Sequence, residues 1–442
     1  MPEATFHFPR GFLWGSATAA HQVEGNNTNN NWYAWEQQPG RILNGDKSGL
    51  ACDWWGGRWR EDFDRAAETG QNAHRLSVEW SRIQPAPDRW DESALDHYRQ
   101  MLQGLRERGL TPMVTLHHFT DPLWLVERGG WEHAGAAELF AAYTEKVVEA
   151  LREYVRLWVP INEPNVYIFS GYISGDFPPG RHNPDLAGRV LANMMRGHAA
   201  AYQTIHRLQP DAMVGAAINF RDFVPARDWS PLDRWSAGQL WENFNEAFLD
   251  ALAYGKYRLF LRGRRLQEAK GTQDFVGVNY YTRDTVAFSL ANPGEMFSRR
   301  FFRPEAELSD TGMLANEPDG FFNVLKRVQR YRLPIYITEN GLEDADDHLR
   351  PRYLVEHIHQ LWRAVNFNWQ IRGYFHWSLV DNFEWERGWT QRFGLWGLDV
   401  NTQARRRRLS VDLYQAINAE NGLSSEMVRK YAPAAVEQLF PG

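Results

Sequence analysis

The chain contains 442 residues, of which 43% are hydrophobic, and its formal net charge is −6 at pH 7. This length can bury a large core, and the mildly acidic balance excludes a global attraction to nucleic acid or to anionic membranes. Cys52 is the only cysteine, which excludes an intrachain disulfide and favours a reducing compartment. No apolar run is long enough to span a bilayer. We therefore expect a cytoplasmic protein with no nucleic-acid or membrane partner.

Eight short apolar runs that end in polar residues follow one another along the chain. Most are rich in Val, Ile, Leu or aromatic residues, as buried strands are. In chain order the predicted strands are Phe12–Thr18, Ala73–Trp80, Thr111–Phe119, Leu157–Pro164, Met213–Phe220, Phe275–Thr282, Pro334–Gly341 and Arg372–Leu379. The amphipathic segments between them, predicted to be helices, include Asp62–Thr69, Ala94–Arg108, Ala136–Tyr154, Arg189–Leu208, Gly320–Tyr331 and Arg352–Phe367. Alternating strands and helices indicate βαβ units and a parallel sheet.

Eight such units fit a closed barrel better than an open sheet. The predicted strands begin about 51 residues apart on average, which is longer than a minimal barrel unit. The excess lies in irregular stretches that follow strand C-terminal ends, where a barrel builds its active site: 24–60, 165–188, 221–238 and 283–319. We predict an α/β fold in which residues 1–442 form a single (β/α)8 TIM barrel with long loops at the C-terminal face of the strands.

Two glutamates end predicted strands on opposite sides of this barrel, Glu163 on the fourth strand and Glu339 on the seventh. Cleavage of a glycosidic bond needs one protonated carboxyl and one ionised carboxylate facing the same cavity. A strand-end glutamate is also a common ion-pair partner, but here polar and aromatic residues suited to a sugar end the neighbouring strands. They are Gln22, Glu24, Arg75, Glu79, His117, His118, Asn162, Asn279, Tyr280, Tyr281, Asn340, Trp377, Asp381, Glu384 and Trp385.

The surroundings of the two glutamates suggest different roles. Arg75, Asn279 and Tyr281 are expected to keep Glu339 ionised through charge and hydrogen bonds. Glu163 has less charged neighbours in the sequence, which are expected to raise its pKa. Esterification of Glu339 would remove a negative charge and lower the pKa of Glu163, so that the acid of one step becomes the base of the next.

Seven motifs carry a resemblance to a known family. They are Gln22-Val-Glu-Gly25, Arg75-Leu-Ser-Val-Glu-Trp-Ser-Arg82, Thr115-Leu-His-His-Phe119, Ile161-Asn-Glu-Pro164, Val278-Asn-Tyr-Tyr281, Ile337-Thr-Glu-Asn-Gly341 and Trp377-Ser-Leu-Val-Asp-Asn-Phe-Glu-Trp385. With them the chain resembles, nearly end to end, family 1 of the glycoside hydrolases. The resemblance implies a retaining β-glycosidase of the β-glucosidase type, with β-galactosidase and β-fucosidase activity, in which Glu163 is the acid/base and Glu339 the nucleophile.

The same resemblance implies how the terminal sugar is held. Asn162 would address the 2-hydroxyl, Gln22 and Glu384 the 4-hydroxyl, and Glu384 also the 6-hydroxyl. His118 and Trp385 would complete the set over a platform formed by Trp377. A glutamate at 384 favours neutral sugars, because a carboxylate repels a 6-phosphate. The expected ligands are small β-glycosides or short β-linked oligosaccharides. The segment Thr311–Asn316 lacks a tryptophan that lines the aglycone site of many relatives.

Several alternatives remain open beside this interpretation. The chain could be a sugar-binding relative without catalysis, although such a protein should lack one carboxylate, or an enzyme that favours transglycosylation. The pairs His117-His118 and His357/His359 could suggest a metal, but neighbouring strand residues point to opposite faces, so we expect no metal and no cofactor. The 20 tryptophans suit either a large core or sugar binding. The basic run from Arg405 to Arg408 is interpreted as a solvated surface stretch.

Overall fold

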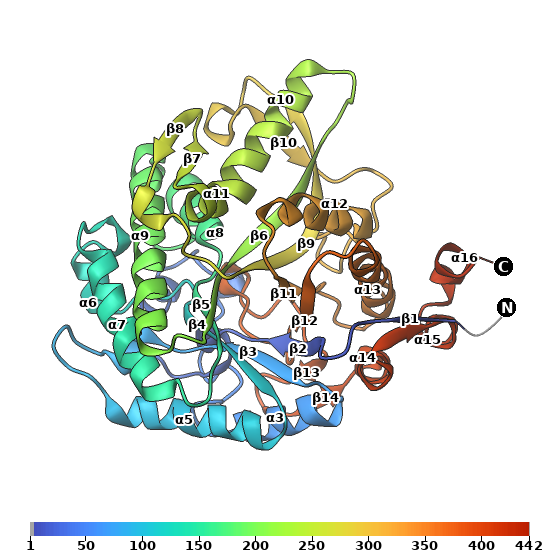
Figure 1. Cartoon of the computed structure of the whole chain (residues 1–442), viewed down its shortest axis with the longest axis horizontal. Helices are drawn as coiled ribbons and strands as arrows, with labels where there is room; N and C mark the ends of the chain where they lie inside the picture. Colours follow the sequence, from blue (N-terminus) through green and yellow to red (C-terminus); the bar gives the residue numbers. More distant parts are fainter. Residues whose placement is uncertain (1–3, 442) are drawn as a thin grey trace.

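The computed structural model describes residues 4–441 and has a closed barrel of eight parallel strands at its centre (Figure 1). Around the barrel the strands follow chain order, each paired with the next, and β12 pairs back with β2. They are β2 (Leu13–Ala17), β3 (Ala73–Ser77), β4 (Thr111–His117), β5 (Leu157–Ile161), β6 (Met213–Pro225), β9 (Phe275–Phe288), β11 (Ile335–Asn340) and β12 (Ile371–Trp377). The predicted (β/α)8 barrel is confirmed.

Six helices between the strands coincide with predicted amphipathic segments. They are α3 (Trp59–Glu68), α5 (Glu92–Glu107), α7 (Ala136–Leu151), α9 (Pro184–Leu208), α12 (Pro318–Val328) and α13 (Arg350–Asn366), and they lie outside the barrel (Figure 1). Side-chain caps explain two of their starts: Asp91 accepts hydrogen bonds from the backbone of Ser93 and Ala94, and Asn183 accepts one from Leu186. Two further helices, α10 (Pro231–Leu240) and α11 (Ala247–Tyr254), fill the connection between β6 and β9.

Two barrel strands continue well past their predicted ends. Beyond a register shift, β6 and β9 stay paired from Asp222↔Arg283 to Pro225↔Val286, and β10 (Ser298–Phe301) adds to β9 in antiparallel register. With α10 this extension projects from the barrel at the top of the view (Figure 1). The stretches 221–238 and 283–319 therefore begin as strands. Ion pairs link the two extended strands, Arg283 to Asp222 at 2.8 Å and Arg221 to Asp284 at 3.0 Å, and these charged residues interrupt the apolar pattern of the sequence.

The chain ends are joined beside the barrel. The short strands β1 (Thr5–His7) and β15 (Gly422–Ser424) pair in antiparallel register. After the last barrel strand the chain forms α14 (Leu409–Glu420), α15 (Ser425–Tyr431) and α16 (Val436–Leu439). Within residues 4–441, no helix is long and apolar enough to cross a membrane.

The basic run near the C-terminus is not the solvated stretch that its composition suggests. Arg405 begins β14 (Arg405–Arg407), which pairs with β13 (Trp396–Leu398), and its fully buried side chain contacts Asp62 at 2.8 Å. Arg408 is also buried and contacts Asp381 at 2.8 Å, whereas Arg406 is exposed. Buried carboxylates compensate the two buried guanidinium groups, and a count of charges along the sequence could not reveal those partners.

Candidate active site

Both predicted catalytic glutamates stand at C-terminal ends of barrel strands, in irregular backbone. Glu163 follows β5 in a left-handed conformation, with φ 45° and ψ 54°, and its N–H donates to the Ala217 carbonyl of β6 at 2.7 Å. Pro164 then begins α8 (Pro164–Ile168). Glu339 follows a register shift in β11 and lies opposite Asn279 of β9. Left-handed residues and bulges both redirect side chains, and both are common at functional sites.

Glu339 lies against a cation. Arg75, on β3, donates from Nη1 to Glu339 Oε1 at 2.6 Å, and the Tyr281 hydroxyl donates to Oε2 at 2.5 Å. Burial raises the pKa of Glu339, and Arg75, Tyr281 and Asn279 oppose that rise. Arg75 and Tyr281 therefore occupy the positions predicted for them.

Among residues 4–441, the hydrogen-bond donors to the Glu163 carboxyl are all neutral. The amides of Asn279 and Asn219 donate to its Oε1 at 2.7 Å and 3.0 Å. Burial, followed by the negative charge of Glu339, raises the pKa of Glu163 to about 8. Asn279 was predicted to support Glu339, but it donates its shortest hydrogen bond to Glu163. Because the cation contacts Glu339, this arrangement favours Glu163 over Glu339 as the site of a proton shared between the two carboxylates.

A chain of hydrogen bonds joins the two glutamates through Asn162. Arg75 Nη2 donates to Asn162 Oδ1 at 2.6 Å, and Asn279 Nδ2 donates to the same oxygen at 3.2 Å. The other end of the Asn162 amide, Nδ2, then faces His118 Nε2 at 3.1 Å. His118 accepts this hydrogen bond as a neutral ring, because burial and Arg75 hold its pKa well below the usual value.

Gln22 and Glu384 meet at another part of the site. Gln22 Nε2 donates to Glu384 Oε2 at 3.0 Å and to the Phe383 carbonyl at 2.9 Å. Gln22 Oε1 is buried and has no partner within residues 4–441. Burial raises the pKa of Glu384 well above its usual value, while the hydrogen bond from Gln22 opposes the rise. An unsatisfied buried acceptor beside a buried carboxyl can receive the hydroxyls of a ligand.

Aromatic rings complete this part of the site. The rings of Trp377 and Trp385 lie 23° and 20° from the plane of His118, with centroids 6.2 and 5.9 Å away. These two tryptophans line the cavity, whereas Trp14, Trp54, Trp80 and Trp158 are fully buried packing residues. The 20 tryptophans therefore serve both the core and the cavity wall.

A cavity of about 520 Å³ contains most of the predicted residues. His118, Glu163, Tyr281, Glu339, Trp377, Glu384 and Trp385 line it. Gln22, Arg75, Asn162 and Asn279 are fully buried and hydrogen-bonded to lining residues. Met313 and Leu314 line the cavity from the segment Thr311–Asn316, which contains no tryptophan.

Some strand-end residues proposed from the sequence take no part in the cavity. Glu24 contacts Arg82 at 2.8 Å, and Asp381 holds Arg408. His117 contacts Asp121 at 3.0 Å, which confirms that it points away from His118. Asn219 is a cavity residue that the sequence reasoning missed. Asn219 stands at the end of the predicted strand Met213–Phe220, and this position is the sequence feature that indicates a place in the cavity.

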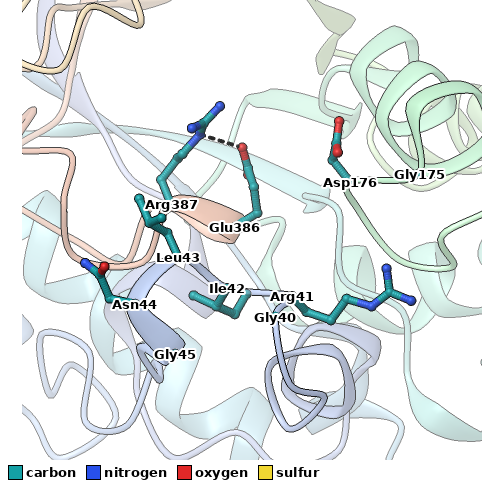
Figure 2. A pocket seen from close by; sticks show the side chains of 10 residues that line it. All are labelled: Gly40, Arg41, Ile42, Leu43, Asn44, Gly45, Gly175, Asp176, Glu386 and Arg387. Carbon is teal, nitrogen blue, oxygen red and sulfur yellow. Dashed lines mark hydrogen bonds and ion pairs between the residues drawn. The ribbon is translucent and has the colours of Figure 1, made fainter.

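An outer groove of about 590 Å³ adjoins the cavity mouth. It is formed by residues 40–45, Gly175, Asp176, Glu386 and Arg387, and the last three residues also line the cavity. Figure 2 shows the ion pair between Glu386 and Arg387, with Arg41 and Asp176 at other parts of the groove. The groove and the cavity therefore share a charged rim.

Comparisons with known proteins agree with this geometry. A family model described as "Glycosyl hydrolase family 1" matches residues 4–423. Beta-glucosidase A of Thermotoga maritima is 34% identical over 447 residues, covering 94% of this chain and 98% of that protein. A beta-galactosidase of Saccharolobus solfataricus is 31% identical, covering 96% and 97%. The structure of a beta-glycosidase from Pyrococcus horikoshii superposes with a TM-score of 0.90 and 37% identity, covering 97% and 98%.

Proposed function

The chain belongs to glycosyl hydrolase family 1, and from this membership we propose that it hydrolyses β-glycosides by a retaining double displacement. Glu339 is the nucleophile and Glu163 the acid/base. One observation carries the assignment: Arg75 contacts Glu339 at 2.6 Å, whereas the described part of the chain offers the Glu163 carboxyl hydrogen bonds from neutral amides alone. The ionised carboxylate suits attack, and the protonated one suits proton donation.

In the first step a carboxylate oxygen of Glu339 forms a bond to the anomeric carbon. The bond from that carbon to the leaving-group oxygen breaks, and this oxygen takes the proton of Glu163. The products are a free alcohol, a glycosyl ester on Glu339 and an ionised Glu163. Burial and, after it, repulsion from Glu339 raise the pKa of Glu163 to about 8; because the ester carries no negative charge, the part due to repulsion is lost.

In the second step Glu163 acts as a base. It takes a proton from a water molecule whose oxygen bonds to the anomeric carbon, while the bond to Glu339 breaks. Glu339 returns as a carboxylate beside Arg75, and two inversions leave the β configuration unchanged. A sugar hydroxyl in place of water gives transglycosylation with the same residues.

The residues around Gln22 and Glu384 bind the terminal sugar in this proposal. Gln22 and Glu384 receive its 4-hydroxyl, Glu384 also its 6-hydroxyl, and Asn162 its 2-hydroxyl. His118 and Trp385 complete the binding site, and Trp377 provides a flat apolar platform. The unsatisfied Gln22 Oε1 supports this assignment. The substrates are small neutral β-glycosides or short β-linked oligosaccharides, with glucose, galactose and fucose as candidate terminal sugars.

We also propose a cytoplasmic location for the enzyme. The support is chemical: the only cysteine, Cys52, is a buried free thiol that donates to the Asp381 carbonyl at 3.3 Å. Disulfides are rare where thiols are kept reduced.

Proton NMR of the first product tests the proposed mechanism. Wild-type protein acting on 4-nitrophenyl β-D-glucoside should release β-glucose before mutarotation produces the α anomer. First release of α-glucose would show inversion and contradict the role of Glu339. Binding of the glucoside, galactoside and fucoside without cleavage of any would contradict the hydrolytic function itself.

A further inference from the structure

Two side-chain amides converge on a single oxygen of Glu163. Asn279 Nδ2 and Asn219 Nδ2 donate to Oε1 at 2.7 Å and 3.0 Å. Within residues 4–441, no hydrogen bond reaches Oε2, the other oxygen of this cavity-lining carboxyl. The two oxygens of Glu163 are therefore not equivalent.

The orientation of the Asn279 amide follows from its neighbours. Arginine can only donate hydrogen bonds, so Asn162 Oδ1, which receives Arg75 Nη2, is an acceptor. The Asn279 atom that contacts this acceptor at 3.2 Å must then be the donor Nδ2. The Thr338 hydroxyl donates to the opposite end of the amide, Asn279 Oδ1, at 2.6 Å. Since Nδ2 also faces Glu163, Oε1 accepts a hydrogen bond, and with two N–H donors converging on this oxygen the carboxyl proton is favoured on Oε2.

Asn219 provides the second donor from the neighbouring strand. It lies on β6 directly opposite Asn279 of β9, and it lines the cavity. Within the described residues, its side chain makes a hydrogen bond only to Glu163. Its backbone carbonyl accepts from Asn165 Nδ2 at 2.7 Å, which ties this part of β6 to the helix that follows Glu163. The site is thus built to hold Asn219 beside Oε1.

We propose that Asn219 is a positioning residue for Glu163: with Asn279 it keeps Oε1 a double acceptor, so that the transferable proton is carried on Oε2 and faces the leaving group. The proposal rests on the assignment of Glu163 as acid/base. It adds a residue from β6 to that machinery and assigns different tasks to the two oxygens, Oε1 for anchoring and Oε2 for proton transfer.

Two consequences distinguish this role from simple packing. Both amides donate to Glu163 in its charged form and lower its pKa, so removal of one should raise the pKa. Loss of the preference for a proton on Oε2 should also lower kcat/KM most for substrates whose leaving group needs protonation. The value of kcat/KM reports the glycosylation step alone, and 2,4-dinitrophenolate leaves without an acid, whereas 4-methoxyphenolate needs one.

The test compares Asn219→Ala and the isosteric Asn219→Asp with wild type, using 2,4-dinitrophenyl and 4-methoxyphenyl β-D-glucosides across pH. In Asn219→Ala we expect about a tenfold loss of kcat/KM for the 4-methoxyphenyl substrate and less than about twofold for the dinitrophenyl one. In the pH profile of kcat/KM for the 4-methoxyphenyl substrate, the alkaline limb should move to higher pH by about half to one unit. It should move further in Asn219→Asp, where a like charge adjoins Glu163.

Asn245→Ala is the matched control. Asn245 accepts from the Arg221 N–H at 3.1 Å and donates to its carbonyl at 2.8 Å, so it supports the same strand without contacting Glu163. The alkaline limb of the kcat/KM profile of Asn245→Ala for the 4-methoxyphenyl substrate should stay at the wild-type pH. Equal losses on both substrates, or an unmoved limb in both Asn219 variants, would overturn the proposal. Glu163→Ala tests the underlying assignment separately, because it must lose activity selectively on the 4-methoxyphenyl substrate if Glu163 is the acid.

Discussion

Arg75 Nη1 lies 2.6 Å from Glu339 Oε1. The Arg75 side chain is 0% exposed to solvent and the Glu339 side chain 4%. The pair crosses the barrel, since Arg75 belongs to β3 and Glu339 to β11. Burial alone would favour a neutral carboxyl, and the guanidinium group opposes that effect. Arg75 also reaches Asn162, so one side chain both compensates the charge of Glu339 and fixes an amide beside it.

Arg75→Met should therefore damage both activity and stability. Without its cation the pKa of Glu339 rises, and because the nucleophile must be ionised, the acidic limb of kcat/KM should move to higher pH. Removing one partner of a buried ion pair costs about 3–5 kcal/mol of unfolding free energy, and we expect kcat/KM to fall at least about 100-fold. pH-rate profiles and urea unfolding measure the two effects. Arg58→Met removes a partly exposed ion pair with Glu61 and serves as the control. An acidic limb that stays in place would contradict the role of Arg75.

The pKa of Glu163 should depend on the charge of Glu339. Burial and the Glu339 charge together raise the Glu163 pKa to about 8, so wild-type kcat/KM should decline above about pH 8 as the acid loses its proton. In Glu339→Gln the negative charge is gone, and the pKa of Glu163 should fall. Carbon-13 NMR titration of labelled glutamate side chains measures the change. The same titration in Glu343→Gln, which alters a buried acid bonded to Ser309 and Thr311, should leave Glu163 unchanged. An unchanged pKa in Glu339→Gln would mean that the two carboxylates are not coupled.

Glu384→Ala should discriminate among sugars. In our proposal Glu384 contacts both the 4- and the 6-hydroxyl, and fucose lacks the 6-hydroxyl that galactose has. The substitution should lower kcat/KM about 100-fold for 4-nitrophenyl β-D-galactoside, but only about tenfold for the β-D-fucoside. The difference arises because a lost hydrogen bond at a buried site costs about 1–3 kcal/mol. Kinetics on both substrates test this. Glu420→Ala, at an exposed site on α14, is the control. Equal losses on the two sugars would remove Glu384 from the 6-hydroxyl.

The buried arginine near the C-terminus should contribute to stability. Arg408 contacts Asp381 through two nitrogen atoms, at 2.8 and 2.9 Å, and both side chains are buried. Arg408→Ala leaves the buried Asp381 carboxylate with only the more distant Arg392, at 3.8 Å, as a cation, and should lower the free energy of unfolding by about 3 kcal/mol. The exposed Arg406→Ala should change it by less than about 0.5 kcal/mol. Urea unfolding of both variants measures the difference, and equal effects would show that burial of the pair is unimportant.

The sequence predicted the barrel well, because its strands are short and apolar in a pattern that does not depend on distant residues. Each predicted strand coincides with an observed one, from β2 to β12. The extensions of β6 and β9 were not predicted, because charged residues such as Asp222 and Arg283 interrupt the apolar pattern there, and their ion pair is visible only in the structure. The prediction that residues 1–442 form a single domain stays a prediction.

The site was predictable where a residue stands at a strand end and its chemistry is distinctive. Glu163, Glu339, His118 and Trp377 all line the cavity for this reason. What could not be predicted is which partner each side chain meets. Asn279 contacts Glu163 through an orientation set by Arg75, which lies four strands away around the barrel and many residues away in the chain. Asn219 was not predicted, because an asparagine at a strand end is not distinctive in the sequence. Its role is indicated only by its distance of 3.0 Å from Glu163.

The roles of the two glutamates are tested most directly by Glu339→Gly with and without azide, using 2,4-dinitrophenyl β-D-glucoside. The variant should be nearly inactive alone, because the anomeric carbon has no nucleophile. Azide is small enough to occupy the place of the missing carboxylate, and it should restore turnover and yield α-D-glucosyl azide. That product would establish attack from the face where Glu339 stands. Full activity of Glu339→Gly without azide, or formation of the β-azide, would contradict the assignment of Glu339 as nucleophile.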